Sequence, residues 1–385
     1  MTKKKMLLVA SVFPPEIGGI QNYVYNIAKN SKHDVTVLCP PTVNCDEFDK
    51  KQNFKIERVS PGNSFFRSLP IMYILFIFRH SRKYDVVCFA QNYWSYIGYF
   101  FKKIFRTRYI IFTYGTDIIF DCDTFSTKIY KFMVRSGLRG ADIVFTLSMW
   151  GRRELEGLGI HTDRVVLLPP GVDFDFFNQT KKTTRLDLFV EKYHLRDKKV
   201  LLTVSRIYDR KGHSMVIKAL PKILEKEPNV IYLVVGGPKH KQEQLERLSE
   251  EYHVRNNVIF TGVLPINMLI DCYHACDVFI MASRYLKKIE DIEGFGIVFL
   301  EANACSRPVI GGNTGGIPDA IKNGVTGYLV DSENADEIAC RCIELLGNDK
   351  LRKRMGINGK KWAREHKWNV IVTKFDRILE EYSWL

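Results

Sequence analysis

Residues 199–213 read K-V-L-L-T-V-S-R-I-Y-D-R-K-G-H, an apolar run that passes through a basic loop into a segment with helical spacing. We interpret this stretch as a buried strand, a loop and the start of a helix. Further short apolar runs follow, and helical segments separate them. These runs occupy residues 230–237, 257–263, 277–283, 308–312 and 327–330.

The same alternation occurs earlier in the chain. Apolar runs there occupy residues 6–12, 34–39, 85–90, 109–114 and 142–148. Strands that alternate with helices predict a parallel sheet with helices on both faces. The fold class is therefore α/β with two Rossmann-like domains, and ligands are expected at the carboxyl ends of the strands.

A stretch rich in turn formers and charge, residues 169–189, separates the two series and is interpreted as a linker. We place the N-terminal domain at residues 1–180 and the C-terminal domain at residues 181–365. The last segment, about 366–385, has apolar residues at helical spacing and is expected to pack back on the N-terminal domain. A length of 385 residues suits two domains of ordinary size.

The composition is that of a globular protein, with 46% hydrophobic and 26% charged residues. A net charge of +14 favours partners that carry phosphate, namely nucleic acid, nucleotides or an anionic membrane. Nucleic acid is disfavoured because the chain has no zinc-finger spacing, no aromatic ribonucleoprotein motif and no long basic tail. The nine cysteines include no C-x-x-C pair, which is typical of a reduced, cytosolic protein without a zinc site.

No window reaches the roughly 18 apolar residues that a membrane span needs. The longest apolar run, residues 69–78, suits a buried or an interfacial helix. The basic and apolar start, residues 1–16, is interpreted as the first strand of a sheet and not as a signal peptide, because no small-residue cleavage site follows it.

Glycine pairs follow the predicted strands, and glycine lets a backbone approach a ligand closely. Gly18-Gly19 and Gly315-Gly316 precede helical segments, whose free N–H groups favour phosphate. Gly236-Gly237 and Gly311-Gly312 are the other two pairs. None fits G-x-G-x-x-G, so a nicotinamide-dependent dehydrogenase is disfavoured.

Two further signals lie in the C-terminal half. Arg206 ends a strand and Lys211 precedes a glycine, so the two side chains could converge on one diphosphate, although a solvated basic loop reads the same way. Glu293 and Glu301 flank the segment G-F-G-I-V-F-L. If much of G-I-V-F-L-E is helical, the eight-residue spacing turns both acids toward one groove, but in isolation a helix with a surface acid at each end is the better explanation.

Together these motifs resemble a retaining GT-B glycosyltransferase of family four, in which E-x7-E is the hallmark, here Glu293 and Glu301. The likeness covers almost the whole chain, with a looser similarity to phosphatidyl-myo-inositol mannosyltransferases in the segment S-R-Y-L-K-K-I-E-D-I-E-G. It implies two Rossmann-like domains facing a central cleft, with the acceptor bound by the first and a nucleotide-diphosphate sugar by the second. The segments that carry it are residues 13–19, 168–174, 204–213, 233–238, 258–264 and 293–330.

The resemblance also implies roles for single residues. Gly18, Gly19 and Gly237 would present backbone to the donor, Arg206 and Lys211 would neutralise the leaving phosphate, and Glu301 would bind the ribose. Glu293, with the backbone at Phe295, Gly296 and Ile297, would hold the transferred sugar. Fixed cations and backbone N–H groups can stabilise the departing charge, so neither a metal nor another cofactor is expected.

The chain departs from the family pattern in several places. Tyr114, followed by Asp117, stands where relatives often have His-Gly in the sugar pocket. Asp319 replaces a common Glu, and Ser306 a common Gly. The segment Asp121-Cys122-Asp123 has the form of a D-x-D metal motif but lacks its context, and we interpret it as a polar loop.

Residues 67–83 and 99–108 give the sequence evidence on the acceptor, because they mix apolar and aromatic residues with basic ones. Such segments suit an anionic membrane surface, and a buried helix with a solvated face is the alternative for 67–83. We therefore expect a lipid- or polyprenyl-linked acceptor, and a cytoplasmic enzyme peripheral to the inner membrane face. A nucleotide-sugar epimerase of GT-B architecture and a non-catalytic nucleotide-sugar-binding subunit are the competing functions.

Overall fold

The computed structural model describes residues 3–60, 71–115, 117–119, 125–179, 184–287 and 290–381. The chain divides into two compact units. Unit 1 combines Met1–Gly171 with Trp368–Leu385, and unit 2 is Val172–Lys367. The boundary precedes the one expected at residue 180 because the short helix α7 (Phe174–Phe177) packs in unit 2, where the Cys305 thiol donates to the Phe177 carbonyl (3.1 Å).

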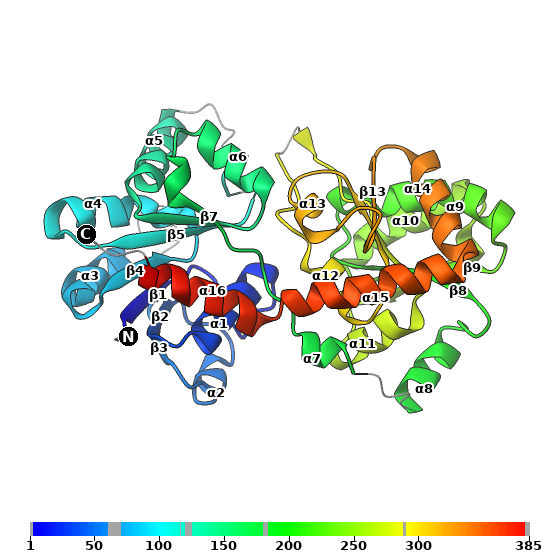
Figure 1. Ribbon diagram of the computed structural model, residues 1–385, viewed down its shortest axis with the longest axis horizontal. Helices are drawn as coiled ribbons and strands as arrows, with labels where there is room; N and C mark the ends of the chain where they lie inside the picture. Colours follow the sequence, from blue (N-terminus) through cyan, green and yellow to red (C-terminus); the bar gives the residue numbers. More distant parts are fainter. Residues whose placement is uncertain are drawn as a thin grey trace. The chain divides into compact units, whose positions relative to one another are not determined.

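Unit 1 is built on a parallel sheet of seven strands in the order β3-β2-β1-β4-β5-β6-β7 (Figure 1). Its strands are β1 (Lys5–Val9), β2 (Asp34–Cys39), β3 (Lys55–Arg58), β4 (Val86–Phe89), β5 (Tyr109–Thr113), β6 (Ile143–Thr146) and β7 (Val165–Leu167). Its helices are α1 (Gly19–Asn30), α2 (Cys45–Asp49), α3 (Ile71–His80), α4 (Ser95–Phe105), α5 (Phe125–Gly140), α6 (Met149–Gly157) and α16 (Trp368–Glu381).

Helix α16 returns to unit 1 from the far end of the chain. It packs beside α1, where the Asp376 carboxylate accepts hydrogen bonds from the Ser31 hydroxyl (2.7 Å) and the Lys32 backbone N–H (3.0 Å). The fully buried ring of Phe375 lies 5.5 Å from the ring of Phe145 on β6. This helix therefore completes one face of the seven-stranded sheet.

Unit 2 is built on a parallel sheet of six strands in the order β10-β9-β8-β11-β12-β13. Its strands are β8 (Lys199–Val204), β9 (Val230–Val235), β10 (Val258–Gly262), β11 (Val278–Met281), β12 (Val309–Gly312) and β13 (Gly327–Val330). Besides α7, its helices are α8 (Thr184–Lys192), α9 (His213–Lys226), α10 (Lys239–Glu251), α11 (Ile266–Ala275), α12 (Ile297–Ala304), α13 (Ile317–Ala320), α14 (Ala335–Gly347) and α15 (Asp349–Glu365).

Both sheets have helices on two faces and nearly continuous apolar strands, as parallel sheets require. The prediction of an α/β fold with two Rossmann-like sheets is confirmed. In each sheet, successive strands are added on one side of the first strand, β1 or β8, and then on its other side, starting with β4 or β11. The direction of strand addition therefore reverses between β1 and β4 and between β8 and β11. Ligand sites in such sheets lie at this switch point, outside the carboxyl ends of the strands.

Candidate functional site

The loop after β8 carries the first cations of the site. Arg206 is exposed, its guanidinium lies 5.0 Å from the centre of the Tyr208 ring, and it has no counter-ion within the part of the chain that the structure describes. The next residues form a short 3-10 turn, Asp209–Lys211, which directs Lys211 inward. Arg206 is therefore placed to receive an anion that the protein itself does not supply.

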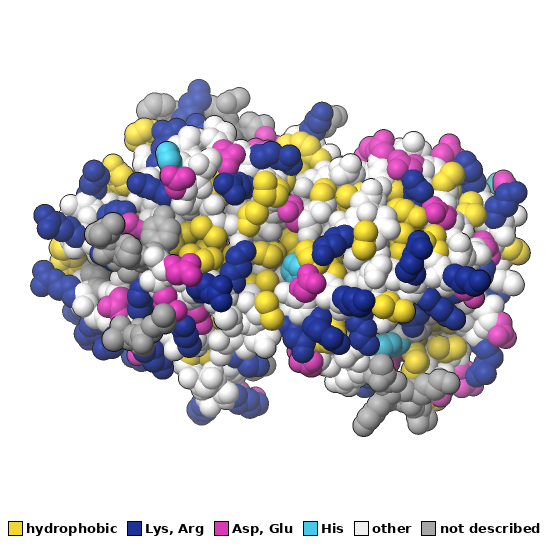
Figure 2. Space-filling view, viewed as in Figure 1, with side chains coloured by type: hydrophobic (Ala, Val, Ile, Leu, Met, Phe, Trp, Pro, Cys, Tyr) yellow, Lys and Arg dark blue, Asp and Glu magenta, His cyan; other side chains and the backbone are white. Residues whose placement is uncertain are grey.

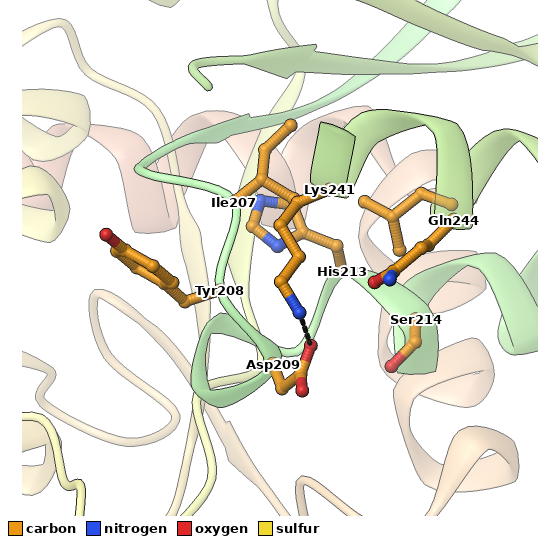
Figure 3. Close-up of a pocket in the computed structure, with 8 residues that line it drawn as sticks. Ile207, Tyr208, Asp209, His213, Ser214, Lys241 and Gln244 are labelled. Carbon is orange, nitrogen blue, oxygen red and sulfur yellow. Dashed lines mark ion pairs between the residues drawn. The ribbon is translucent and has the colours of Figure 1, made fainter. Parts of the chain in front are cut away.

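Figure 3 shows the outer side of this loop, where it borders α10. The Lys241 ammonium reaches to 3.9 Å from the Asp209 carboxylate, and the Tyr208 ring points away from that pair. His213 is buried below them, with its Nε2 atom 3.2 Å from the Ser205 hydroxyl. Burial and the neighbouring Lys211 charge lower the pKa of His213 to about 3, so its ring is neutral at neutral pH.

Glu293 is the centre of the charged cluster in unit 2. Its Oε2 atom accepts hydrogen bonds from Lys211 Nζ and Arg210 Nη1, each at 2.5 Å. Arg210 also places its Nε 2.8 Å from Asp291 Oδ1. Only 10 to 14% of the side chains of Arg210, Lys211 and Glu293 is exposed, so this is a largely buried network.

Electrostatics decide the protonation of the pair. Burial alone would raise the pKa of Glu293, but the charges of Lys211 and Arg210 outweigh burial and lower it to about 2. Burial lowers the pKa of Lys211, and the Glu293 charge opposes that effect. Arg210 was not among the predicted site residues, and its place directly before Lys211 was the sequence signal available.

The helix expected within G-I-V-F-L-E is present, but it does not reach back to Glu293. Helix α12 starts at Ile297, so Glu301 is helical and Glu293 lies in the loop before it. Gly296 has φ 89°, and a Cβ there would lie 2.7 Å from the ring of Phe299. This left-handed turn stops the helix from extending back to Glu293.

Glu301 accepts a hydrogen bond from the Tyr273 hydroxyl of α11 (2.6 Å). Burial raises the pKa of Glu301 to about 7, although the bond from Tyr273 opposes the increase. The ring of Phe295 is buried, so only its backbone can serve a ligand. Phe295, Phe299 and Leu300 are buried in the core, as the sequence predicts, whereas Ile297 and Val298 are partly exposed. The two acids take separate partners.

Glycine loops surround Glu293 and the end of β8. Gly316 donates its N–H to the Glu293 carbonyl (2.9 Å), and Gly315 has φ 57° with its would-be Cβ 2.4 Å from the same oxygen. Gly237 accepts from the Ile207 N–H (2.5 Å). The structure therefore brings Lys211 and the Gly315-Gly316 loop together at Glu293, and it places Gly237 beside Ile207 in the loop after β8.

In unit 1, Gly18 and Gly19 begin helix α1. Gly18 has an extended backbone (φ 178°), and a Cβ on Gly19 would meet nothing within 4 Å. The preceding Ile17 is fully exposed. A Cβ on Gly18 would lie 2.2 Å from Oε1 of Gln21, so that side chain fills the space beside Gly18, and only the space beside Gly19 is open. The free N–H groups at this helix start suit an anionic ligand.

A second polar group follows β4 and β5. Asp117 Oδ1 accepts from the backbone N–H groups of Tyr114 and Gly115, both at 2.8 Å, and the Asp117 carbonyl accepts from Asn92 Nδ2 at 2.5 Å. Burial raises the pKa of Asp117 to about 6, and the two backbone bonds oppose the increase.

Several buried atoms of this group lack a hydrogen-bond partner among the described residues. They are Tyr114 Oη, Asp117 Oδ2, Asn92 Oδ1 and Gln91 Nε2. Since β4 and β5 are neighbours, these atoms lie in the segments that follow the carboxyl ends of two adjacent strands. Buried polar atoms are normally paired with protein, water or a ligand, so these atoms mark a candidate polar binding position. Gln91 and Asn92 were not predicted, although a polar pair directly after a strand was a usable signal. The segment 121–123 lies outside the described residues.

Two family profiles match this chain in succession. Glycosyltransferase Family 4 matches residues 17–176, and Glycosyl transferases group 1 matches residues 187–362. A GDP-mannose-dependent alpha-(1-6)-phosphatidylinositol monomannoside mannosyltransferase of Mycolicibacterium smegmatis is 29% identical over 382 residues. That alignment covers 97% of this chain and 98% of the relative.

Solved structures share the fold. HepE of Anabaena, in complex with UDP, superposes with a TM-score of 0.82 at 18% identity, over 98% of this chain and 100% of that one. WaaG, a glycosyltransferase involved in lipopolysaccharide biosynthesis, superposes with a TM-score of 0.69 at 19% identity, over 97% and 99% of the two chains.

Proposed function

This chain belongs to the family 4 glycosyltransferases of the GT-B fold, and from that premise we propose that it is a retaining hexosyltransferase. It moves a hexose or related sugar from a UDP- or GDP-sugar to an acceptor hydroxyl. The acceptor is a lipid- or polyprenyl-linked glycan of cell-envelope, lipopolysaccharide or glycolipid biosynthesis. Unit 2 binds the donor and unit 1 the acceptor.

The observation that carries this proposal is the buried cluster at the end of β8. Lys211 and Arg210 hold Glu293 ionised, while Arg206 beside them has no counter-ion among the described residues. A nucleotide diphosphate supplies the missing negative charge. Arg206 and Lys211 then stabilise the charge that develops on the leaving diphosphate. Glu293 accepts hydrogen bonds from hydroxyls of the transferred sugar.

The remaining roles are proposed from the family resemblance. Glu301 accepts hydrogen bonds from the two ribose hydroxyls, and in unit 1 the free N–H groups of α1 at Gly18 and Gly19 suit an anion. Tyr114 and Asp117 contribute the unpartnered hydroxyl and carboxylate oxygens noted above to the sugar or the acceptor. The backbone at Gly237, Phe295, Gly296 and Ile297 completes the donor site.

Transfer needs no metal in this scheme. The bond between the anomeric carbon and the phosphate oxygen breaks, and its electron pair leaves with the diphosphate. The acceptor oxygen bonds to the anomeric carbon from the same face, and its proton passes to the departing phosphate oxygen. Preorganised cations and N–H groups carry the stabilisation because they need no reorganisation during the reaction.

The names of relatives support a lipid-linked acceptor without identifying one. The Mycolicibacterium relative is named a phosphatidylinositol monomannoside mannosyltransferase, and WaaG is a glycosyltransferase involved in lipopolysaccharide biosynthesis. With such an acceptor, we propose that the enzyme acts in the cytoplasm, peripheral to the inner membrane face. No helix in the described part of the chain has the length and apolarity to cross a membrane. GDP-mannose is the first donor to test, because the relative's name specifies it.

The decisive experiment measures thermal shift and calorimetric binding against UDP-, GDP-, ADP- and dTDP-sugars, with Glu301→Ala in parallel. One donor should stabilise the protein, and the variant should lose that stabilisation. Incubating the stabilising donor without acceptor then separates the functions: an epimerase converts it to another nucleotide sugar. Failure of every donor to bind contradicts the proposal. Binding with no transfer to any lipid- or polyprenyl-linked acceptor favours a non-catalytic subunit.

A further inference from the structure

Glu293 and Glu301 are held by the protein in the same way, each through one carboxylate oxygen. Lys211 and Arg210 both donate to Oε2 of Glu293, and the Tyr273 hydroxyl donates to Oε2 of Glu301. The Oε1 atoms of the two acids accept no hydrogen bond within the part of the chain that the structure describes, and neither is one of the buried atoms there that lack a partner. Each Oε1 is therefore left free for a ligand.

The side chain of Tyr273 is fixed in the core of unit 2. It is fully buried on α11, and its ring lies 5.5 Å from the ring of Phe177 and 5.8 Å from the ring of Phe279. Its backbone carbonyl accepts a hydrogen bond from Arg307 Nε (3.1 Å). Among the described residues, the Tyr273 hydroxyl has Glu301 as its one partner (2.6 Å). Because the ring is packed on several sides, its hydroxyl is directed at one fixed point.

A buried tyrosine hydroxyl needs an acceptor, but it does not need a carboxylate. A backbone carbonyl or a side-chain amide would serve without the cost of burying a charge. Burial raises the pKa of Glu301 to about 7, so the environment disfavours the charged form of this acid. Satisfying the Tyr273 hydroxyl does not explain an acid at this position, whereas presenting a carboxylate oxygen to a ligand does.

The charged and titratable groups around Glu301 come from several elements. Tyr273 lies on α11, Cys305 directly follows α12, and Lys360 lies on α15, which packs beside α12. Burial raises the pKa of Cys305, so its thiol is neutral at neutral pH. Arg307 directs its guanidinium to two backbone carbonyls, and Figure 2 shows Lys and Arg side chains on the outer surface along α15. The remaining charged groups on helices that contact α12 are Asp175 on α7 and Asp319 on α13. Among the described residues, Tyr273 is the group that lowers the pKa of Glu301 against the effect of burial.

We propose that Tyr273 is a positioning residue of the donor site: its hydroxyl holds Oε2 of Glu301 and so presents Oε1 to the ribose of a nucleotide. The inference rests on the proposed role of Glu301 in binding the donor ribose. Tyr273 is fully buried, so it acts through Glu301 and not on the substrate. A carboxylate that is oriented before the nucleotide arrives loses little conformational freedom on binding, which favours affinity.

The first test measures the ionisation of Glu301 without any donor. Carbon-13 NMR of the full chain labelled at Glu Cδ follows the titration, and Glu301→Gln identifies the signal. Because the Tyr273 hydroxyl stabilises the ionised carboxylate, Tyr273→Phe should raise the midpoint by about one pH unit. In wild type, the Cζ signal of Tyr273 should titrate with the same midpoint as Glu301. An unchanged midpoint in the variant, or a Tyr273 signal that does not follow Glu301, overturns the proposal.

The second test measures whether the effect reaches the ribose. The affinities of UDP and GDP are compared by calorimetry at pH 7 with those of their 2′,3′-dideoxy analogues. Raising the midpoint by about one pH unit lowers the ionised fraction of Glu301 from about one half to about one tenth. Tyr273→Phe should therefore bind the ribonucleotide about 5-fold more weakly at pH 7 and the dideoxy analogue as wild type does, and most of the loss should disappear at pH 9. Equal weakening for both nucleotides would show a structural role and would overturn the proposal.

Tyr328→Phe is the matched control, because the Tyr328 hydroxyl donates to Glu344 Oε1 (2.7 Å) elsewhere in unit 2. It should change neither nucleotide affinity nor the Glu301 midpoint, and an effect as large as that of Tyr273→Phe contradicts the inference. The proposed role of Glu301 fails if wild type binds neither ribonucleotide or binds the dideoxy analogue equally tightly, and the inference then fails with it. A preference for ribose that Tyr273→Phe leaves intact overturns the inference alone.

Discussion

Replacing Glu293 with Gln tests the buried charge network at the end of β8. The variant keeps the shape of the side chain but leaves Lys211 without a counter-ion, while Arg210 retains Asp291. The pKa of Glu293 falls from 4.5 to about 2, which corresponds to about 3 kcal/mol at about 1.4 kcal/mol for each tenfold change in proton affinity. Removing one partner of a buried ion pair costs about 3–5 kcal/mol, which agrees.

The pH dependence gives the direction of the effect. Because the folded-state pKa lies below the ordinary value, the stabilisation is present above about pH 4.5 and is lost as the pH falls toward about 2. The difference in the free energy of unfolding between wild type and Glu293→Gln should therefore be full at pH 7 and shrink through this window.

Hydrogen exchange of the β8 and β9 amides measures the unfolding free energy of unit 2 by itself. The control is Glu246→Gln, whose partner Arg255 lies 3.3 Å away and is 43% exposed, and which should cost less than about 1 kcal/mol. If Glu293→Gln costs no more than the control, or if its cost is unchanged at low pH, the charge network does not stabilise unit 2 as argued.

Three further results are expected. Arg206→Ala and Lys211→Ala should each lower kcat about 100-fold or more, and full kcat in both would contradict the role of charge stabilisation. Donor affinity measured calorimetrically should rise as the pH increases through about 7, because ionised Glu301 accepts hydrogen bonds from both ribose hydroxyls. The variant Glu301→Gln should bind the donor at least about 10-fold more weakly, and its affinity should not depend on pH in this range. Tyr114→Phe should leave the melting temperature unchanged or raise it, since the Tyr114 hydroxyl is buried without a partner among the described residues. The same variant should weaken donor or acceptor binding. A lower melting temperature with unchanged binding would show that the hydroxyl is structural.

The strands that face two helical layers were predictable, because burial on both sides makes them continuously apolar. Each predicted run contains a strand, for example β2 at Asp34–Cys39 and β13 at Gly327–Val330. The strands that the sequence did not reveal are β3 and β7, both at the edges of the unit 1 sheet. β3 reads K-I-E-R and is half-exposed, so it gives no apolar run, and β7 reads V-V-L and is only three residues long.

Site residues were predictable where the residue type alone indicates the chemistry. They were not predictable where the role depends on a partner that is distant in the sequence. Lys211 and Glu293 do meet, as the hypothesis of one phosphate and sugar site requires. The start of α12 depends on how Gly296 packs against the Phe299 ring, which no spacing reveals. Likewise, Arg210 pairs with Asp291, which lies in a segment far along the chain.

Helix α16 also has a consequence for synthesis and engineering. The chain leaves unit 1 at Gly171 and returns at Trp368, so the face that α16 covers stays open until all of unit 2 has been made. During translation, unit 2 can close first although it begins later. A fragment ending at residue 171 would expose the apolar surface that Phe375 covers, and a chimera that exchanges unit 1 with a relative must carry both segments together.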